Sequence, residues 1–364
     1  MPPYEYFKKV LTGEEKGWRA FCWRGVLFAL AAFYACLLPA VRFIKWHFRR
    51  MMPVFTVSVG NLTAGGTGKT PVVIYLAERF LRDGIRPAVL LRGYRAQSAG
   101  KIRIVSDENQ LLLTPEQAGD EAYLLGLKLP GVPVLADANR FRAALAADAR
   151  FHPDVLVLDD AFQQWSLRKD VEIALVDAAD PFGPCWLLPA GTMREFPSAL
   201  RRSDILLLTR TDQVPRAELE KLVKKLKGIH PKARIIHSIH KPSGVADLAD
   251  WREARSSISK PASEIAVLTA IGNPASFMRS LENMGYQVMK TRVYPDHYWF
   301  QPADLLRYAG EAASCGIEHI VITEKDAVKF PPVSELGSAA HWWVLTMELK
   351  IIEGEEQLWE FIKK

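Results

Sequence analysis

From Met51 onward, short apolar runs alternate along the chain with longer stretches whose apolar residues recur at helical spacing. The runs are rich in Val, Ile and Leu and carry almost no polar interruption (residues 54–59, 87–91, 132–136, 154–160, 172–178 and 204–210). Near-continuous apolar strands are typical of a parallel sheet that is covered on both faces by helices. The stretches between them, such as Lys69–Arg82 and the Ala-rich one that ends at Arg150, predict those helices. The pattern therefore predicts an α/β fold.

The alternation is interrupted once, by the polar stretch His240–Glu264, which we interpret as a linker. Beyond it, three further apolar runs and a helix beginning at Pro274 predict a second, smaller α/β lobe (runs at 264–273, 319–326 and 342–347). We therefore expect an N-terminal segment, a large α/β domain, a linker and a C-terminal lobe (1–52, 53–240, 241–263 and 264–364).

The N-terminal segment contains an uncharged apolar run, Gly25–Val41, framed by Arg24 and Arg42. Tryptophans, which favour the headgroup layer of a bilayer, flank it (Trp18, Trp23 and Trp46). The run has 17 residues, the short limit for a helix that crosses a membrane, and Pro39 weakens its last turn. We expect a membrane-seated helix, with spanning and in-plane placements both open. The alternative is a buried helix of a soluble core.

The net positive charge is concentrated in the N-terminal segment, which limits the kinds of partner that we expect. Residues 1–52 hold nine Lys or Arg and three acids, which account for the whole net charge of +6, so the main body is neutral. A nucleic-acid groove is therefore not expected, and no protein partner is evident. The four cysteines are scattered without a CxxC pair, which argues against a disulfide framework or zinc site and suits a reducing compartment.

The first strand candidate runs directly into a glycine-rich turn, GNLTAGGTGKTP at residues 60–71. The strict phosphate-loop pattern GxxxxGK[ST] would place a glycine at position 63, where this chain has Thr63. The physical requirements are nevertheless met, because glycines let backbone amides turn inward and a helix starts near Lys69 with its positive end toward an anion. We expect Lys69 to reach the β- and γ-phosphates of a nucleotide and the Thr70 hydroxyl to bind Mg²⁺.

Two adjacent acids, Asp159 and Asp160, end a later apolar strand. Neighbouring carboxylates repel each other and lose hydration unless a cation lies between them. Their place after a strand favours a role at the Mg²⁺ of a bound nucleotide, with a solvated strand end as the alternative.

Two function classes follow from a phosphate loop with a metal site. One is a kinase, and the other is a GTP-driven switch or a regulator similar to a metallochaperone. The switch is favoured by TRTD at 209–212, which is similar to a guanine-reading [NT]KxD with Arg in place of Lys, but the expected DxxG is replaced by DDAF. A membrane-anchored structural ATPase is a third possibility, for which we identify no oligomerisation surface.

Seven motifs, taken together and in order, identify a family resemblance (SVGNLTAGGTGKTP at 58–71, RGY at 92–94, GDEAYLL at 119–125, LDDAFQQ at 158–164, LLPAGTMRE at 187–195, YPDHYWF at 294–300 and TEKDAVK at 323–329). The chain resembles tetraacyldisaccharide 4′-kinase, the lipid A 4′-kinase of Gram-negative bacteria. The resemblance implies phosphorylation of the 4′-hydroxyl of a tetraacylated glucosamine disaccharide 1-phosphate by ATP with Mg²⁺. It also implies a P-loop NTPase-like core, a C-terminal lobe that closes over the nucleotide, and work at the cytoplasmic face of the inner membrane.

The resemblance assigns roles to residues of this chain. The ATP loop is the run Thr63, Ala64, Gly65, Gly66, Thr67, Gly68, Lys69 and Thr70. Asp159 and Asp160 match an acidic pair near Mg²⁺, with Asp160, Thr70 and Glu195 as metal contacts, Asp159 and Lys69 among the catalytic residues, and Arg194 at the phosphates. Asp120 matches an aspartate that activates the acceptor hydroxyl, and His297 the histidine that partners it. Such a base contributes about 100- to 10,000-fold in rate.

The chain departs from the family's usual text in two of these motifs. DDGFQH reads DDAFQQ, with Ala161 and Gln164 in place of glycine and histidine, and GPLREP reads GTMREF, with Thr192 and Phe196 in place of the two prolines. Glutamine neither carries a charge nor shuttles a proton, so we assign Gln164 no catalytic role.

Overall fold

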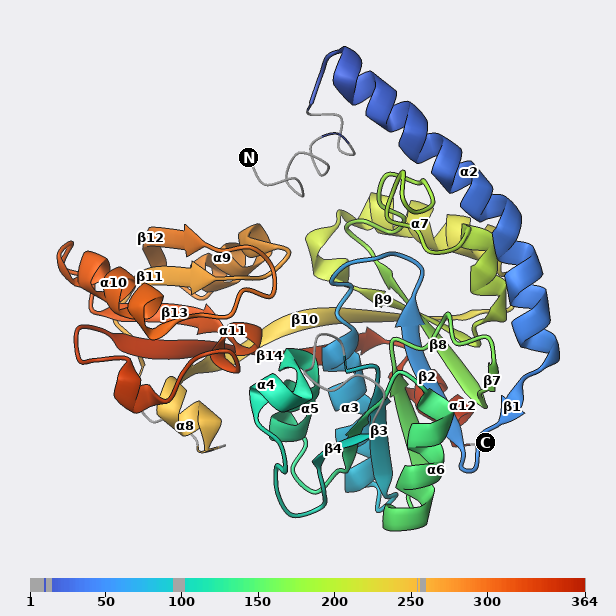
Figure 1. Ribbon diagram of the computed structural model, residues 1–364, viewed down its shortest axis with the longest axis horizontal. Coiled ribbons are helices and arrows are strands. Elements are labelled where there is room, and N and C mark those ends of the chain that lie inside the picture. The colour runs from blue at the N-terminus through green and yellow to red at the C-terminus, as the bar shows by residue number, and fades with distance from the viewer. Residues whose placement is uncertain (1–9, 11–14, 94–101, 254, 256–259, 364) are drawn as a thin grey trace. The chain divides into compact units, whose positions relative to one another are not determined.

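The computed structural model describes residues 10, 15–93, 102–253, 255 and 260–363. The chain forms two compact units (Figure 1). The first unit combines residues 1–69, 157–239 and 350–364, and the second combines 70–156 and 240–349. Each unit is thus built from segments that are distant in sequence.

The first unit is centred on parallel strands in the order β10-β9-β8-β2. Every position of β2 (Thr56–Asn61), β8 (Val171–Asp177) and β9 (Ile205–Thr209) is buried, which explains why the sequence shows unbroken apolar runs there. The remaining elements are β1 (Arg50–Met51), β6 (Val155–Asp159), β7 (Leu167–Arg168), α7 (Arg216–Ile229), β10 (Arg234–Asp247) and α12 (Glu355–Ile362), with 3-10 helices η1 (Pro197–Arg202) and η2 (Thr211–Gln213).

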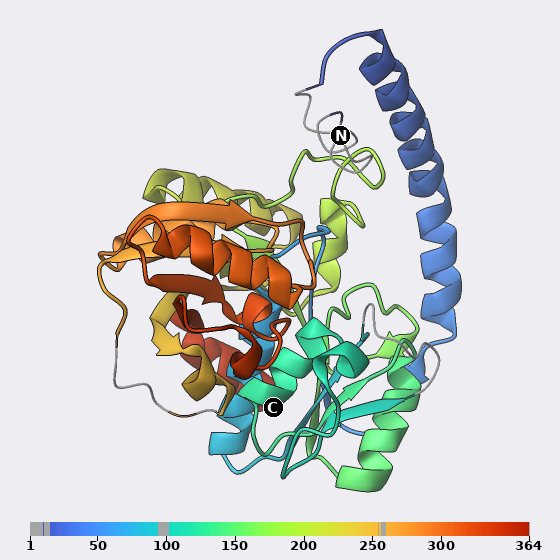
Figure 2. The same cartoon turned by 60° about the vertical axis from the view of Figure 1, so that its left-hand side comes forward.

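A long helix, α2 (Trp18–His47), lies on the outside of the first unit (Figures 1 and 2). It is 30 residues long and contains an 18-residue window of mean hydropathy 2.0, of which only 11% is buried. By length and composition it is a candidate membrane span. Tyr34 and Ala35 pack against the apolar core of the unit, so one side of the helix is anchored to protein.

The second unit begins with α3 (Lys69–Arg82), whose start coincides with the end of the glycine-rich turn. β3 pairs in parallel with β5, and β4 pairs with β5 in the antiparallel direction. The bounds in this part are β3 (Pro87–Leu91), β4 (Arg103–Ser106), α4 (Pro115–Ala118), α5 (Asp120–Lys128), β5 (Val134–Ala136) and α6 (Arg140–Phe151).

The C-terminal part of the second unit is a parallel sheet in the order β12-β11-β13-β14. One hydrophobic cluster joins α5, through Leu124, to Leu305 and Ile320 of this part. The elements are α8 (Leu248–Arg252), β11 (Glu264–Thr269), α9 (Pro274–Asn283), β12 (Gln287–Val293), α10 (Pro302–Ala313), β13 (His319–Thr323), α11 (Glu324–Ala327), η3 (Val333–Glu335) and β14 (His341–Glu353).

The segment that we interpreted as a linker is more ordered than its composition indicates. β10 continues through its first part as far as Asp247, and α8 follows directly. Lys241, Pro242, Ser243 and Gly244 interrupt the apolar pattern, which is the reason why the sequence suggested a break. β12 was not predicted from the sequence either, because its side chains alternate between exposed and partly buried positions.

Asp326 is a buried acid just after β13, and its contacts predict a contribution to stability. Asp326 has no exposed surface, and its carboxylate accepts hydrogen bonds from the Thr269 hydroxyl (2.8 Å) and the Ala270 amide (3.1 Å) and pairs with buried Lys329 (3.0 Å). Asp326→Ala leaves an uncompensated buried ammonium, so we expect a loss of about 3–5 kcal/mol in the free energy of unfolding. Denaturant titration measures it. The double variant with Lys329→Met should lose less; an equal loss would contradict this explanation.

Candidate active site

The glycine-rich turn after β2 is held open by its own backbone and its neighbours. Gly65 and Gly68 have φ of 126° and 83°, values that side chains other than glycine rarely adopt. The Ala64 amide donates to the Thr192 carbonyl at 2.7 Å, which fixes the first half of the turn. A Cβ at Gly60 would lie 2.6 Å from the Phe162 nitrogen, so glycine is also required near the end of β2, just before the turn. The turn has the shape of a phosphate cradle that leads into α3.

Lys69, the first residue of α3, is held by two partners of the first unit. Its Nζ donates to Asn61 Oδ1 at 3.2 Å and lies 3.7 Å from Asp160 Oδ1. Asn61 is fully buried, and its amide also donates to the Thr63 carbonyl at 2.6 Å. Asn61 was not predicted as a site residue, although it ends the strand that precedes the turn, where polar residues commonly face a ligand.

The structure brings Asp160 and Arg194 together. Arg194 Nη1 contacts both carboxylate oxygens of Asp160, at 2.8 and 3.0 Å, and donates to Gln163 Oε1 at 3.2 Å. Gln163 in turn donates to the Asn61 carbonyl at 3.0 Å. Asp160 has φ of 49°, a left-handed conformation that is uncommon for a non-glycine residue and frequent at functional sites. Two cations, Lys69 and Arg194, therefore surround one carboxylate beside the phosphate turn.

Glu195 occupies a different environment from the metal contact that the resemblance implied. It has no exposed surface, and Arg202 donates to its two oxygens at 2.8 and 2.7 Å. Trp165 Nε1 donates to it as well, at 3.3 Å. Because these donors already satisfy the carboxylate, the geometry favours a structural role for Glu195 in the loop that carries Arg194.

The other two predicted metal contacts, Thr70 and Asp160, have the right chemistry for Mg²⁺, and so has Asp159, which is predicted as a catalytic residue of the same acidic pair. Asp159 is 4% exposed at the end of β6, and Thr70 is 7% exposed as the second residue of α3. Among the described residues no group of three His, Cys, Asp or Glu could enclose an ion by itself. Mg²⁺ bound to a nucleotide does not need such a cage, since a hydroxyl and one or two carboxylates complete a shell of phosphate and water oxygens. The donor set fits the ion.

Arg210 of the TRTD sequence supports the phosphate turn. Its guanidinium donates to the Gly66 carbonyl at 2.8 Å and forms a short ion pair with Asp177. Asp212, which would read a guanine in the switch hypothesis, is exposed. The geometry thus indicates that the TRTD sequence stabilises the phosphate turn through Arg210.

In the second unit, the structure brings Asp120 and His297 into direct contact, although 177 residues separate them. His297 Nδ1 lies 2.6 Å from Asp120 Oδ2, and the other carboxylate oxygen accepts from the Glu121 amide at 2.9 Å. Asp120 is the first residue of α5, and His297 has φ of 63° and donates its amide to the Ala270 carbonyl. A carboxylate oriented by an imidazole is suited to accept a proton from a hydroxyl.

The electrostatics of this pair favour its charged form. Burial alone would raise the pKa of Asp120, but the hydrogen bond from His297 and the positive charges of Lys325 and Lys329 hold that pKa below its ordinary value. The hydrogen bond to Asp120 raises the pKa of His297, against the opposing effect of burial. Each partner thus shifts the pKa of the other toward its charged form.

The TEKD sequence, Thr323–Asp326, contacts both α5, which carries Asp120, and the backbone near His297. Glu324 binds Lys128 of α5 at 2.8 Å, and Lys325 binds Glu121 of α5 at 2.9 Å. Ala270 connects Asp326 to His297. Its backbone amide donates to the Asp326 carboxylate, and its carbonyl accepts a hydrogen bond from the His297 amide. These residues were missed as site residues, since the sequence shows no spacing that connects α5 and α11. Of the RGY motif, Tyr94 lies outside the described residues.

The ion pair gives a pH dependence with a defined sign. Because the folded pKa of Asp120 is depressed, its stabilisation is present above the unfolded value near 3.9 and is lost as the pH falls through the folded pKa. Because the folded pKa of His297 is raised, its stabilisation is present below about 6.5 and is lost as the pH rises through the folded pKa. The stability difference between the parent and His297→Gln should be largest from about pH 4 to 6.5. Thermal melts across pH measure it, and a flat difference would contradict the ion pair.

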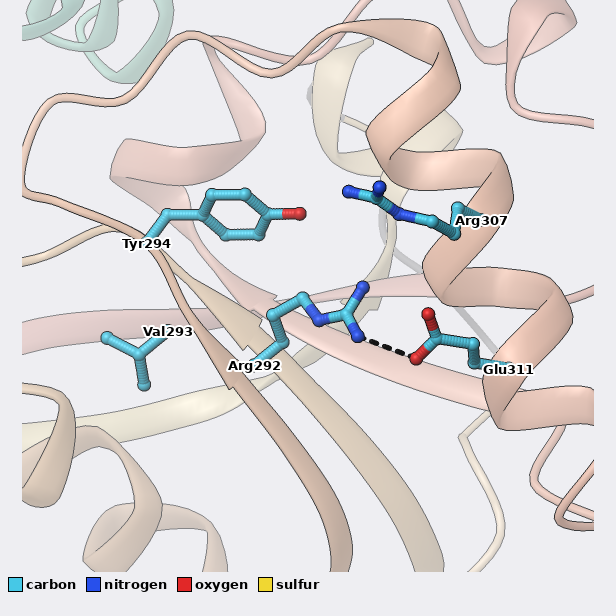
Figure 3. Close-up of a pocket in the computed structure, with 5 residues that line it drawn as sticks. All are labelled: Arg292, Val293, Tyr294, Arg307 and Glu311. Carbon is cyan, nitrogen blue, oxygen red and sulfur yellow. Dashed lines mark hydrogen bonds and ion pairs between the residues drawn. The ribbon is translucent and has the colours of Figure 1, made fainter.

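A separate cavity of about 380 Å³ lies in the C-terminal part of the second unit (Figure 3). Arg292, Arg307 and the ring of Tyr294 face one another across it. Arg292 pairs with Glu311 at 2.6 Å, and Arg307 pairs with Asp304 at 3.2 Å. Because both guanidinium groups are already paired, we do not interpret this cavity as a phosphate site.

Known proteins are similar in sequence to this chain over almost its whole length. The family model for tetraacyldisaccharide-1-P 4′-kinase matches residues 23–364. A tetraacyldisaccharide 4′-kinase from Halothermothrix orenii is 36% identical over 335 residues, which cover 87% of this chain and 86% of the relative. One from Anaeromyxobacter dehalogenans is 38% identical over 302 residues, which cover 83% and 79%.

A solved structure confirms the fold. The crystal structure of the "apo" form of LpxK from Aquifex aeolicus in complex with ATP aligns with a TM-score of 0.75 at 28% identity, over 93% of this chain and 98% of that one. The predicted mostly parallel α/β architecture is therefore correct.

Proposed function

Because the chain belongs to the tetraacyldisaccharide-1-P 4′-kinase family, we propose that the residues described above transfer the γ-phosphoryl group of ATP to the 4′-hydroxyl of a tetraacylated disaccharide 1-phosphate. The family membership makes the chain a kinase of lipid A biosynthesis. The assignment of each step to a residue is the proposal. Its single strongest support is the contact of 2.6 Å between His297 and Asp120, since a hydroxyl acceptor needs a base and a GTP switch does not.

The phosphate side of the reaction uses the first turn and its cations. Amides of Thr63–Gly68 and the ammonium of Lys69 bind the phosphates, and Arg194 exchanges its contact with Asp160 for one with a transferring oxygen. Thr70, Asp159 and Asp160 would hold Mg²⁺, which neutralises charge on the phosphates when bound. Glu195, whose carboxylate is bound by Arg202, keeps the loop in place.

The acceptor side uses the pair in the second unit. The Asp120 carboxylate takes the proton of the sugar hydroxyl as the oxygen attacks, and the contact with His297 lowers the pKa of that carboxylate and fixes its orientation until then. Lys325 and Glu324 fix α5 through ion pairs with Glu121 and Lys128, which holds Asp120 at the start of the helix in place. No covalent intermediate with the protein is required.

Nucleotide and acceptor dependence test the function. Purified protein should transfer label from ATP to the lipid disaccharide and show little nucleotide turnover when the acceptor is withheld. Hydrolysis of GTP at an equal rate without acceptor would favour the switch instead. That alternative has little structural support, because Arg210 is engaged with Gly66 and Asp177.

The acyl chains of the substrate explain the apolar helix. Drawing four chains out of a bilayer costs roughly 0.8 kcal/mol for each exposed CH₂, so the enzyme must work at the lipid. We propose that α2 and the basic residues around it seat the protein on the cytoplasmic face of the inner membrane, where anionic lipid attracts Lys and Arg.

Removal of residues 1–50 tests this placement. The truncated protein should bind ATP with unchanged affinity but lose most activity on substrate held in vesicles, because the phosphate turn is retained and the membrane helix is not. Isothermal titration and a vesicle assay measure the two quantities. Full activity on vesicles after the truncation would show that α2 does not supply the membrane contact.

A further inference from the structure

The turn that carries Asp159 and Asp160 depends on the backbone of the residue that follows it. Asp160 has φ of 49°, a left-handed conformation that persists in a non-glycine residue only where the surrounding structure holds it. Ala161 comes next and is fully buried, so its backbone amide and carbonyl need partners inside the protein. The amide donates to the Val59 carbonyl of β2 at 3.1 Å. The conformation of the acidic pair is therefore set by the groups that bind Ala161.

A buried ammonium group binds the Ala161 carbonyl. Lys169 Nζ donates to this oxygen at 2.9 Å, and the backbone amide of Gln164 donates to it at the same distance. The side chain of Lys169 is only 7% exposed. Removing an ammonium from water is costly, and a carbonyl that already accepts one hydrogen bond does not require a second donor. Satisfying the carbonyl alone therefore does not account for a lysine at this position.

A buried carboxylate compensates for the charge and fixes the lysine to the sheet. Lys169 forms a short ion pair with Glu172 of β8, which is also buried. The other oxygen of Glu172 accepts a hydrogen bond from the Ser58 hydroxyl at 2.6 Å, and Ser58 is the residue of β2 that pairs with Glu172 in the register of the two strands. Asp170, next to the lysine, exchanges two hydrogen bonds with Thr56 at the start of β2 (2.8 and 3.0 Å). The ammonium is thus held by the strand that runs into the phosphate turn.

We propose that Lys169 is a positioning residue for phosphoryl transfer: held by Glu172, it binds the Ala161 carbonyl and so keeps Asp159 and Asp160 in the conformation that binds the Mg²⁺ of a nucleotide. Two adjacent carboxylates repel each other, so a turn that lacks this contact is free to separate them before the metal binds. Residues that support metal ligands commonly change metal affinity about 10- to 100-fold when they are removed. This inference rests on the proposed roles of the acidic pair at the metal.

Two substitutions separate positioning from stability. Glu172→Gln leaves the buried ammonium without its counter-ion, so the protein should lose stability, but the lysine, charged or neutral, still donates to the Ala161 carbonyl. Adding Lys169→Met removes both the buried charge and the donor. The double variant should therefore be more stable than Glu172→Gln and yet bind metal more weakly. Lys227→Met is the matched control, because Lys227 Nζ donates to a carbonyl of the same unit outside the acidic turn, that of Ala233, at 2.7 Å.

Nucleotide affinity with and without metal measures the effect directly. Isothermal titration of a non-hydrolysable ATP analogue, first with Mg²⁺ and then with EDTA, isolates the gain in affinity that the metal supplies. This gain should be about tenfold smaller in the double variant, the lower end of the expected range because Lys169 binds backbone rather than a carboxylate. The affinity in EDTA should equal that of the parent, and Glu172→Gln and Lys227→Met should keep the full gain. An undiminished gain in the double variant, an equal loss in Glu172→Gln, or a parent without any gain would overturn the proposal.

The Mg²⁺ dependence of phosphoryl transfer gives a second measurement. With the acceptor dispersed in detergent, the Mg²⁺ concentration for half-maximal rate should rise about tenfold in the double variant, and saturating Mg²⁺ should restore most of the parental rate. A lower maximal rate with an unchanged half-maximal Mg²⁺ concentration would mean that the buried pair acts on the fold alone, and would overturn the proposal. Absence of transfer by the parent, with the difference in nucleotide affinity intact, would contradict the proposed function and not the role of Lys169.

Discussion

Asp120→Asn is expected to lower kcat by about 100- to 10,000-fold, the contribution of a positioned general base, while changing the KM for ATP little. Asparagine keeps the shape and can accept a hydrogen bond from His297, but it cannot take the proton of the acceptor hydroxyl. Steady-state kinetics with ATP and detergent-dispersed acceptor measure both constants. The loss should appear in kcat because the base acts in the transition state.

A matched control separates this effect from the loss of a charge. Asp212→Asn removes an exposed carboxylate in the first unit and should leave kcat within the error of the parent. It also tests the guanine-reading hypothesis, since a switch that read GTP through Asp212 would lose its nucleotide preference. An Asp120→Asn variant with half of the parental kcat would exclude Asp120 as the base.

Lys69→Ala should reduce kcat/KM by about 100- to 1,000-fold, the usual cost of removing one preorganised charge from a transition state. The ammonium is already fixed beside the phosphate turn by Asn61 and Asp160, so little reorganisation is needed when a nucleotide binds. Nucleotide affinity, measured by titration, should fall in the same variant. Lys69→Arg keeps the charge but changes its geometry, and we expect partial activity from it.

A matched substitution at Asn61 shows whether that positioning matters. Asn61→Ala removes the partner of the lysine without touching the charge, and should lower kcat by less than Lys69→Ala does. Equal activity of Lys69→Ala and the parent would mean that the glycine-rich turn does not bind the triphosphate.

The sequence predicted the strands of the parallel sheet because burial on both faces leaves almost no polar residue in them. β3 follows the apolar run Pro87–Leu91 residue for residue, and α3 begins where the glycine-rich turn ends. β10 was predicted less well, since its second half is half-exposed and contains Pro242 and Gly244. Apolar periodicity reports burial, so it is weak where a strand is exposed.

The site was predicted unevenly, for a related reason. Lys69 and the turn could be inferred from local chemistry, because a phosphate loop is contiguous in sequence. The contact between Asp120 and His297 could not be inferred that way, since 177 residues separate them, and only the family resemblance paired them. Asn61, Gln163 and the TEKD contacts have no signature in spacing at all. The predicted role of Glu195 at the metal stays a prediction, and the structure adds its ion-pair partner Arg202, which the motif does not indicate.

The destination of the γ-phosphate is the most direct test of the account. ATP that carries heavy oxygen in its γ-phosphoryl group should be incubated with the purified protein and the tetraacyl disaccharide 1-phosphate, and the labelled position in the lipid determined from the isotope shift in the phosphorus NMR spectrum. We expect one labelled phosphomonoester per lipid, at the 4′-oxygen, and far less of it in Lys69→Ala over the same time. Label that appears only as inorganic phosphate, or that is attached to the existing 1-phosphate, would contradict it.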